Sequence, residues 1–226
     1  MENTCAAVIV AAGSATRMNG IDKIMSELGG IPMILRTVRA MAASDKIDEI
    51  VVVTREDLIE KVTKICRGEK KFRKAIPGGS SRAESVMNGI LAVNTDLVAI
   101  HDGARPFVTT QIIDETVKKT SECGAAAPAV PVRDTIKVAQ DHKIVCTPDR
   151  STLFAVQTPQ IFNRKQIVSA LQDAIEHQLP LTDDCSAAEA AGMEVFLTEG
   201  SSENIKITTP VDLAFCEAIL KWRERH

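Results

Sequence analysis

The sequence lacks any apolar run of the roughly 18 residues that a membrane-spanning helix needs. Its N-terminus also lacks a basic stretch followed by an apolar segment and a cleavage site, the pattern of a secretory signal. The formal net charge of −3 provides no basic field of the kind that neutralises many nucleic-acid phosphates. We therefore expect a cytoplasmic protein that binds neither membranes nor nucleic acids.

Close cysteine pairs are absent too. Zinc sites and redox motifs use such pairs, whereas the six cysteines here are scattered singly, so we expect most of them to be buried as small hydrophobic side chains. Hydrophobic residues make up 45% of the 226-residue chain, which is enough for one sizeable core. No linker, repeat or low-complexity segment divides the sequence. It therefore predicts a single domain spanning residues 1–226.

Short β-branched runs alternate with amphipathic helical patterns along almost the whole chain. This alternation predicts an α/β fold of Rossmann-like form, with a mostly parallel central sheet flanked by helices. Several runs are continuously apolar, as strands covered on both faces should be. The expected strands are residues 6–11, 49–54, 73–76, 97–101, 125–130 and 195–198. Helices are expected at 32–43, 56–65 and 210–222, and after Ser81, which has capping-box spacing to Glu84.

One stretch departs from this alternation. Residues 133–138 and 143–146 are strand-like runs separated by the polar turn 139–142, which predicts a β-hairpin inserted in the α/β chain. The pattern alone leaves two interpretations open. The hairpin is either an ornament at the sheet edge or an arm that reaches a second subunit.

The loop after the first expected strand has the composition of a phosphate-binding turn. Small side chains let backbone N–H groups approach a phosphate closely. The dinucleotide fingerprint and the P-loop are both excluded, because Gly13 has no partner glycines and no G-K-[ST] at the required spacing. Arg17 and Lys23 add two cations suited to nucleotidyl transfer, although spacing alone also allows a simple turn followed by solvated charges. The small residues are Ala11, Ala12, Gly13, Ser14 and Ala15.

Together with later blocks, this loop resembles a known family. The chain carries LGGIPM at 28–33, GGSSRAESV at 78–86, HDGARP at 101–106, PVRDT at 131–135, QTPQ at 157–160, TDD at 182–184 and NIKIT at 204–208. In this order the blocks resemble the 2-C-methyl-D-erythritol 4-phosphate cytidylyltransferases, a family of nucleotidyltransferases, over nearly the whole chain. Each block alone is weakly specific, whereas the set is highly specific.

The resemblance implies a CTP-using enzyme that acts on methylerythritol phosphate with Mg²⁺ or another divalent cation. Arg17, Lys23, Arg150 and Lys206 are then expected to be catalytic, and Asp102 to bind the metal. The resemblance also implies a homodimer, in which an arm at about 132–152 carries Thr135 and Arg150 to the partner's active site. The expected nucleotide site is Ala11, Ala12, Gly13, Ser14, Ala15, Gly79, Arg82, Ser85, Asp102 and Gly103. The expected acceptor site is Asp102, Arg105, Thr135, Arg150, Thr182 and Lys206.

Simpler interpretations exist for several of these residues. Asp102 and Gly103 also form an ordinary Asp-Gly turn, Thr182 and the acids after it also form a helix-start signal, and Arg150 beside Asp149 also forms a surface ion pair. His101 is expected to be structural, and the role of residues 158–160 is left unassigned. At Ala15 the family usually has glycine, and around Lys23 it has a proline-lysine-glutamine run, so nucleotide affinity is expected to differ from the family's norm.

Two other functions compete with this interpretation. A ribitol 5-phosphate cytidylyltransferase would share nearly all of the nucleotide residues. A non-catalytic nucleotide-binding protein would keep the fold, but the intact set of charged residues argues against it.

Overall fold

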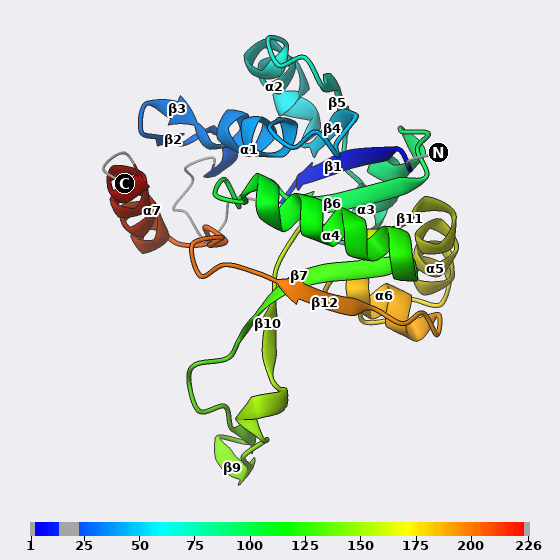
Figure 1. Cartoon of the computed structure of the whole chain (residues 1–226), viewed down its shortest axis with the longest axis vertical. Helices are drawn as coiled ribbons and strands as arrows, with labels where there is room; N and C mark the ends of the chain where they lie inside the picture. The colour runs from blue at the N-terminus through cyan, green and yellow to red at the C-terminus, as the bar shows by residue number, and fades with distance from the viewer. Residues whose placement is uncertain (1–2, 14–22, 224–226) are drawn as a thin grey trace.

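Eight strands form one central sheet within residues 3–13 and 23–223, the residues that this computed structural model describes. They are β1 (Cys5–Ala11), β4 (Glu49–Thr54), β5 (Phe72–Pro77), β6 (Leu97–Asp102), β7 (Ala125–Pro131), β10 (Phe154–Val156), β11 (Gln160–Asn163) and β12 (Phe196–Glu199). Their order is β10–β7–β11–β6–β1–β4–β5, with β12 paired to β7 (Figure 1). Only β10 and β11 run antiparallel to their neighbours in this described sheet. The predicted α/β fold with a mostly parallel sheet is confirmed.

Helices cover both faces of the sheet. On one face lie α1 (Met33–Ala42), α2 (Ile59–Cys66) and α4 (Thr110–Cys123), and on the other lie α3 (Arg82–Leu91), α5 (Arg164–Glu176) and α6 (Asp184–Ala190). Successive side chains of a strand point to opposite faces, so Ile9 packs with the first group and Val8 with the second. This two-sided burial explains why the central strands are almost entirely apolar.

The helix starts follow the predicted signals with two differences. The Ser81 hydroxyl caps α3 by accepting from the Glu84 N–H at 3.1 Å, but the Glu84 carboxylate bonds to the N–H and hydroxyl of Ser80, so the capping box is only half formed. The helix expected at 56–65 is a 3₁₀ turn (Glu56–Leu58) followed by α2.

The last helix, α7 (Pro210–Arg223), packs on a small hairpin of β2 (Glu27–Leu28) and β3 (Ile31–Pro32). Their shared core includes Ala104 and Ile207, which directly flank loops of the site described below. Among the described helices, none is long and apolar enough to cross a membrane.

The inserted hairpin is present, but its first strand was predicted wrongly. It consists of β8 (Val138–Gln140) and β9 (Lys143–Cys146), not a strand at 133–138. Asp141 and His142 have φ of 50° and 62°, so they form a two-residue turn that pairs Gln140 with Lys143. The last pair of the hairpin joins Val138 to Cys146, after a register shift between Val138 and Ala139. The hairpin projects well away from the sheet, beyond β7 and β10 (Figure 1).

Four strands were not predicted, namely β2 and β3 of the small hairpin and β10 and β11 of the central sheet. β10 and β11 have three and four residues, too few to show a two-residue period, and Pro159 separates them. β11 lies between β6 and β7 and is antiparallel to both. It brings the Thr158–Pro159 peptide bond, which is cis, to the carboxyl end of β6.

Ellman's reagent is expected to titrate at most two of the six thiols rapidly in the native protein, because only Cys123 and Cys146 are not buried. Burial raises the pKa of Cys5 and of Cys66 to about 12, and the thiolate is the reactive form. The buried thiols, which include Cys185 and Cys216, should react only after guanidinium chloride is added. Rapid reaction of four or more thiols in the native state would contradict the described core.

Candidate functional site

A pocket of about 480 Å³ opens at the carboxyl ends of β1 and β6, beside the N-terminus of α3. Parallel α/β sheets bind ligands at this edge. Ser14, Ala15 and Arg17, expected at the same place, lie outside the described residues. The predicted residues that line the pocket are Ala11, Ala12, Gly13, Lys23, Gly79, Arg82, Ser85, Asp102, Gly103 and Lys206.

Gly103 allows two of the pocket's loops to touch. Its N–H donates to the Val10 carbonyl at 2.9 Å. A Cβ at this position would lie 2.9 Å from the Ala11 Cβ and 3.2 Å from the Val10 oxygen, closer than side chains normally pack. Only glycine therefore fits at position 103 without displacing Ala11 or Val10 in the pocket wall.

Gly103→Ala is expected to destabilise the protein by about 1–3 kcal/mol, the usual range for overpacking, and to raise the KM of the nucleotide that the sequence leads us to expect in this pocket, because Ala11 must move. Urea unfolding and steady-state kinetics measure the two effects. Gly68→Ala is the matched control, since a Cβ there meets nothing within 4 Å. Equal behaviour of the two variants would exclude this steric role.

A second wall is formed by the turn before α3. The Ser85 hydroxyl accepts from the Gly79 N–H at 3.0 Å and donates to the Ser81 carbonyl at 2.8 Å. Ser85 is buried, so both of these bonds are shielded from water. The turn is thereby fixed against the first residues of the helix.

Asp102 lies at the centre of the pocket's charged groups. Its Oδ2 is 2.9 Å from Lys206 Nζ and 3.4 Å from Arg105 Nε, and its Oδ1 is 3.8 Å from Arg82 Nη2. Burial alone would raise the pKa of Asp102, but Lys206, Arg82 and Arg105 outweigh it and lower the value to about 2. The carboxylate is therefore ionised at any physiological pH.

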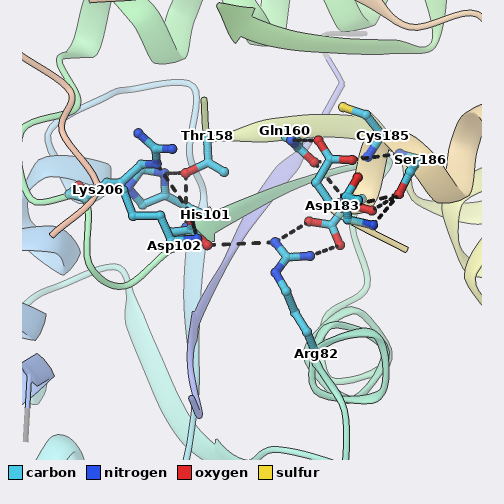
Figure 2. Close-up of polar contacts among 12 residues, drawn as sticks. Arg82, His101, Asp102, Thr158, Gln160, Asp183, Cys185, Ser186 and Lys206 are labelled. Carbon is cyan, nitrogen blue, oxygen red and sulfur yellow. Dashed lines mark hydrogen bonds and ion pairs between the residues drawn. The ribbon is translucent and has the colours of Figure 1, made fainter. Parts of the chain in front are cut away.

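Arg82 bridges Asp102 to a second, deeply buried carboxylate (Figure 2). Its Nη1 and Nη2 donate to the two oxygens of Asp184 at 2.8 and 2.7 Å. Burial opposes the charge on Arg82, but Asp184 and Asp102 raise its pKa above the ordinary value. Removing Arg82 would leave the buried Asp184 carboxylate without its cationic partner, which is unfavourable. The guanidinium is thus fixed before any ligand binds.

The described site carries three cations, Arg82, Arg105 and Lys206, against the two carboxylates Asp102 and Asp184. Lys23 adds a further cation at the pocket wall. Asp102 is the one carboxylate among the described lining residues, and nowhere in the described ranges do three or more His, Cys, Asp or Glu side chains group as metal ligands. The arrangement suits a polyanion, whose own oxygens would complete the coordination of a divalent cation held by Asp102.

Comparison with known proteins agrees with this chemistry. A family model described as IspD, 2-C-methyl-D-erythritol 4-phosphate cytidylyltransferase, matches residues 5–222. The chain belongs to this cytidylyltransferase family. The cytidylyltransferase of that name from Caldanaerobacter subterraneus subsp. tengcongensis is 46% identical over 227 aligned residues, which cover 95% of this chain and 98% of the relative. The one from Desulforamulus reducens is 42% identical, with 96% of each chain covered.

Solved cytidylyltransferase structures have the same fold. The 4-diphosphocytidyl-2C-methyl-D-erythritol synthase from Anaerococcus prevotii superposes with a TM-score of 0.88 at 30% identity, covering 97% of both chains. The 2-C-methyl-D-erythritol 4-phosphate cytidylyltransferase from Francisella tularensis gives 0.82 at 27% identity, with 95% of this chain and 99% of that one covered. The likeness therefore extends over nearly the whole chain.

Four residues that the family resemblance assigned to the acceptor do not line this cytidylyltransferase pocket. Arg105 is held beside it, with its Nε 3.4 Å from Asp102 Oδ2. Thr182 lines a neighbouring cavity of about 340 Å³, which shares Ser81 and Arg82 with the main pocket. Thr135 and Arg150 are exposed in the segment between β7 and β10 that projects from the sheet. Arg150 donates to the Arg133 carbonyl at 3.0 Å, and the Asp149 carboxylate accepts from the Ser151 N–H. The two side chains therefore do not form the surface ion pair that was considered for Arg150.

Sequence reasoning missed several buried polar residues that support the cytidylyltransferase site. Asp184 was interpreted only as part of a helix-start signal, and Asp183 and Ser186 do form a capping box there. Gln160 accepts from the N–H groups of Asp184 and Cys185 and so holds this helix start against β11. His101, expected to be structural, is fully buried and bonds to Thr158 (Figure 2). The sequence signal that could have indicated Thr158 and Gln160 was the QTPQ block at 157–160, to which no function was assigned.

Proposed function

We propose that the chain transfers CMP from CTP to 2-C-methyl-D-erythritol 4-phosphate, giving 4-diphosphocytidyl-2-C-methyl-D-erythritol and pyrophosphate, a step of non-mevalonate isoprenoid biosynthesis. The observation that carries the proposal is the cationic pocket around Asp102, lined by the residues that the family blocks supply. Full-length relatives named for this acceptor support methylerythritol phosphate over ribitol phosphate.

The chemistry needs no general base. An oxygen of the acceptor's phosphate forms a bond to the α-phosphorus of CTP, and the bond to pyrophosphate breaks in line. A phosphate monoester has a second pKa of about 6, so the nucleophile is already largely dianionic near neutral pH. The protein's task is to orient the two substrates and to neutralise the charge that collects around phosphorus. We assign this neutralisation to Lys23 and Arg17.

The nucleotide is assigned to the walls built from small residues. Cytosine presents a carbonyl and an exocyclic amine, so it needs backbone donors and acceptors. Gly79, Ser85 and the carbonyls of Ala11 and Ala12 are the candidates, because they meet at one side of the pocket. The triphosphate is assigned to the remaining small residues of the first loop and to Gly103, with Arg82 beside it. Those loop residues are Gly13, Ser14 and Ala15.

Asp102 is proposed to hold Mg²⁺ or another divalent cation. The fit is favourable because this carboxylate is ionised, lines the pocket and is the one acid among its described lining residues. Oδ2 already contacts Lys206 and Arg105, so Oδ1, 3.8 Å from Arg82, is the less committed oxygen. Mg²⁺ commonly takes one or two carboxylates plus substrate phosphates, and when bound it neutralises charge on the triphosphate.

The acceptor is assigned to the other side of Asp102. Lys206 is proposed to bind its phosphate together with Thr182, which lines the neighbouring cavity that shares Arg82 with the pocket. Arg105 and Asp102 are proposed to bind its hydroxyl groups. In the ligand-free chain Lys206 pairs with Asp102, so the incoming phosphate must compete with that carboxylate for the ammonium group. Neutralisation of Asp102 by a divalent cation weakens this competition.

Thr135 and Arg150 are proposed to act in the site of a second copy, in a homodimer of single-domain chains joined through an arm at about 132–152. The segment between β7 and β10 that carries them projects away from the sheet, and neither residue lines its own chain's pocket, which supports this proposal. The same segment exposes Ile136, Val138 and Ile144, which contact with a partner would shield from water. The proposed compartment is the cytoplasm, where CTP is available, with no nucleic-acid or membrane partner.

One assay tests the function. The protein is incubated with Mg²⁺, each of the four nucleoside triphosphates in turn and a panel of polyol phosphates that includes ribitol 5-phosphate, and pyrophosphate release is followed. Release that requires both CTP and methylerythritol phosphate is expected, and EDTA should abolish it. Release that is faster with ribitol 5-phosphate would replace the proposed acceptor, and no release with any pair would overturn the proposal.

A further inference from the structure

Four residues close a ring of hydrogen bonds directly behind the pocket. Thr158 Oγ1 lies 2.9 Å from His101 Nδ1, and His101 Nε2 lies 3.0 Å from the Arg105 carbonyl. Arg105 Nη1 donates to the Asn204 carbonyl at 2.7 Å, and Asn204 Nδ2 donates to the Thr158 carbonyl at 2.9 Å. His101, Thr158 and Asn204 are all buried (Figure 2 shows the first two). The ring therefore joins three segments that are far apart in the sequence.

The donors and acceptors fix the direction of every bond. The Asp102 N–H donates to Thr158 Oγ1 at 3.1 Å, so the threonine proton is free to be donated to His101 Nδ1. Nδ1 is then the acceptor, and the neutral ring carries its proton on Nε2, which faces a carbonyl that only accepts. The Asn204 amide is fixed in the same way, because its Nδ2 also faces the Gln157 Oε1 acceptor at 3.3 Å.

The ring holds the charged groups on the acceptor side of the pocket. Asp102 directly follows His101, Arg105 is itself a member, and Lys206 lies two residues after Asn204. The sheet register explains why a side chain is needed here. On the β1 side Asp102 still pairs with Val10, but on the β11 side the pairing ends at Ile100, opposite Gln160. On that side the Asp102 N–H bonds to the Thr158 hydroxyl in place of a strand carbonyl.

We propose that Thr158, acting through His101 and Asn204, is a positioning residue that sets Asp102, Arg105 and Lys206 in the arrangement needed to bind and orient the acceptor phosphate. None of the four members of the ring (His101, Arg105, Thr158 and Asn204) lines the described nucleotide walls, so the effect falls on the acceptor and not on the base. Loss of the hydroxyl would leave the Asp102 N–H and His101 Nδ1 buried without partners. Small displacements of reacting groups lower rates steeply, by about 10²-fold for 1 Å.

The decisive comparison uses two substitutions of Thr158 and one control. Thr158→Val keeps the shape and removes the hydroxyl, and Thr158→Ser keeps the hydroxyl. Thr116→Val is the matched control, because Thr116 is equally buried and its hydroxyl bonds to the Ile112 carbonyl and the Thr198 hydroxyl, away from the pocket. The measurements are kcat/KM for methylerythritol phosphate, the Kd for CTP in EDTA, and the unfolding midpoint in urea.

Thr158→Val is expected to lower kcat/KM for the acceptor by about 10- to 100-fold, while the Kd for CTP without metal changes less than about threefold. Thr158→Ser should recover most of the activity. Thr116→Val should shift the unfolding midpoint without changing acceptor kinetics. Wild-type acceptor kinetics in Thr158→Val, or equal kinetic losses in Thr116→Val, would overturn the positioning role.

A measurement on the unaltered protein covers the case in which Thr158→Val does not fold. Nitrogen-15 NMR of the imidazole rings at neutral pH should show one buried histidine as the Nε2–H tautomer, and an Nδ1–H tautomer for that ring would overturn the ring of bonds. The positioning role of Thr158 rests on the proposed function, but the experiments distinguish the failure of one from the failure of the other. A wild-type protein with no transferase activity rejects the function, whereas an active wild type with an unaffected Thr158→Val variant rejects only the positioning role.

Discussion

Replacing Lys23 with alanine is expected to lower kcat by about 10²- to 10³-fold, the usual loss when one group that stabilises transition-state charge is removed. Lys23 lines the same pocket as Asp102 and Lys206, where the triphosphate is proposed to lie. Binding of CTP should survive in part, because the base is assigned to the turn before α3 and not to Lys23. Steady-state kinetics gives kcat, and calorimetry gives the Kd for CTP.

Lys64→Ala is the control for this prediction. Lys64 is an exposed cation on α2, outside the pocket lining, and its removal changes the net charge by the same amount. The control should keep wild-type kcat and KM at low and at high salt. Near-normal turnover of Lys23→Ala would remove Lys23 from the catalytic set.

Mixing two inactive variants is expected to restore activity if the arm completes a partner's site. Lys23→Ala and Arg150→Ala each inactivate every site of their own homodimer under the proposed arrangement. In a mixed dimer, one site combines both defects and the other has neither. After full subunit exchange about half of the dimers are mixed, so about a quarter of the wild-type activity should return.

The exchange itself needs independent proof, for which native mass spectrometry of differently tagged variants is suitable. A control mixture of Lys23→Ala with Lys206→Ala should remain inactive, because both groups line the pocket of one chain and no mixed dimer then has an intact site. If Arg150 instead serves its own chain, the first mixture stays inactive despite proven exchange. Activity in the control mixture would contradict the assignment of Lys23 and Lys206 to one chain.

Much of the fold follows from the sequence because its central strands are buried on both sides. β4 was predicted to the residue, and the predictions for β1, β6 and β7 were at most one residue short at either end. Such strands must be apolar throughout, and that requirement is visible in any short window. β10 and β11 were missed because their pairing is set by long-range contacts with β7 and β6, which a few residues do not encode.

The charged residues of the site were recognisable by their types, but their partners were not. The family resemblance assigned Arg105 and Asp102 to one acceptor site, and Arg105 Nε does lie 3.4 Å from Asp102 Oδ2. Nothing local indicated that Asp184 would meet Arg82, which is 102 positions away along the chain, or that Asn204 would meet Thr158. Buried polar networks arise from the packing of whole elements, so residues of ordinary appearance in the sequence acquire their function only in the folded chain.

The position of β5 at the end of the sheet limits how far association can extend. Arg73 and Lys74 are exposed on this terminal strand, and Pro77 ends it. Cations and proline on an unpaired strand discourage the addition of a strand from another molecule. The hairpin arm leaves from the other side, between β7 and β10. The border of the sheet at β5 is therefore protected against strand addition, so the proposed pairing through the arm would produce a closed particle of fixed size and not a growing fibre.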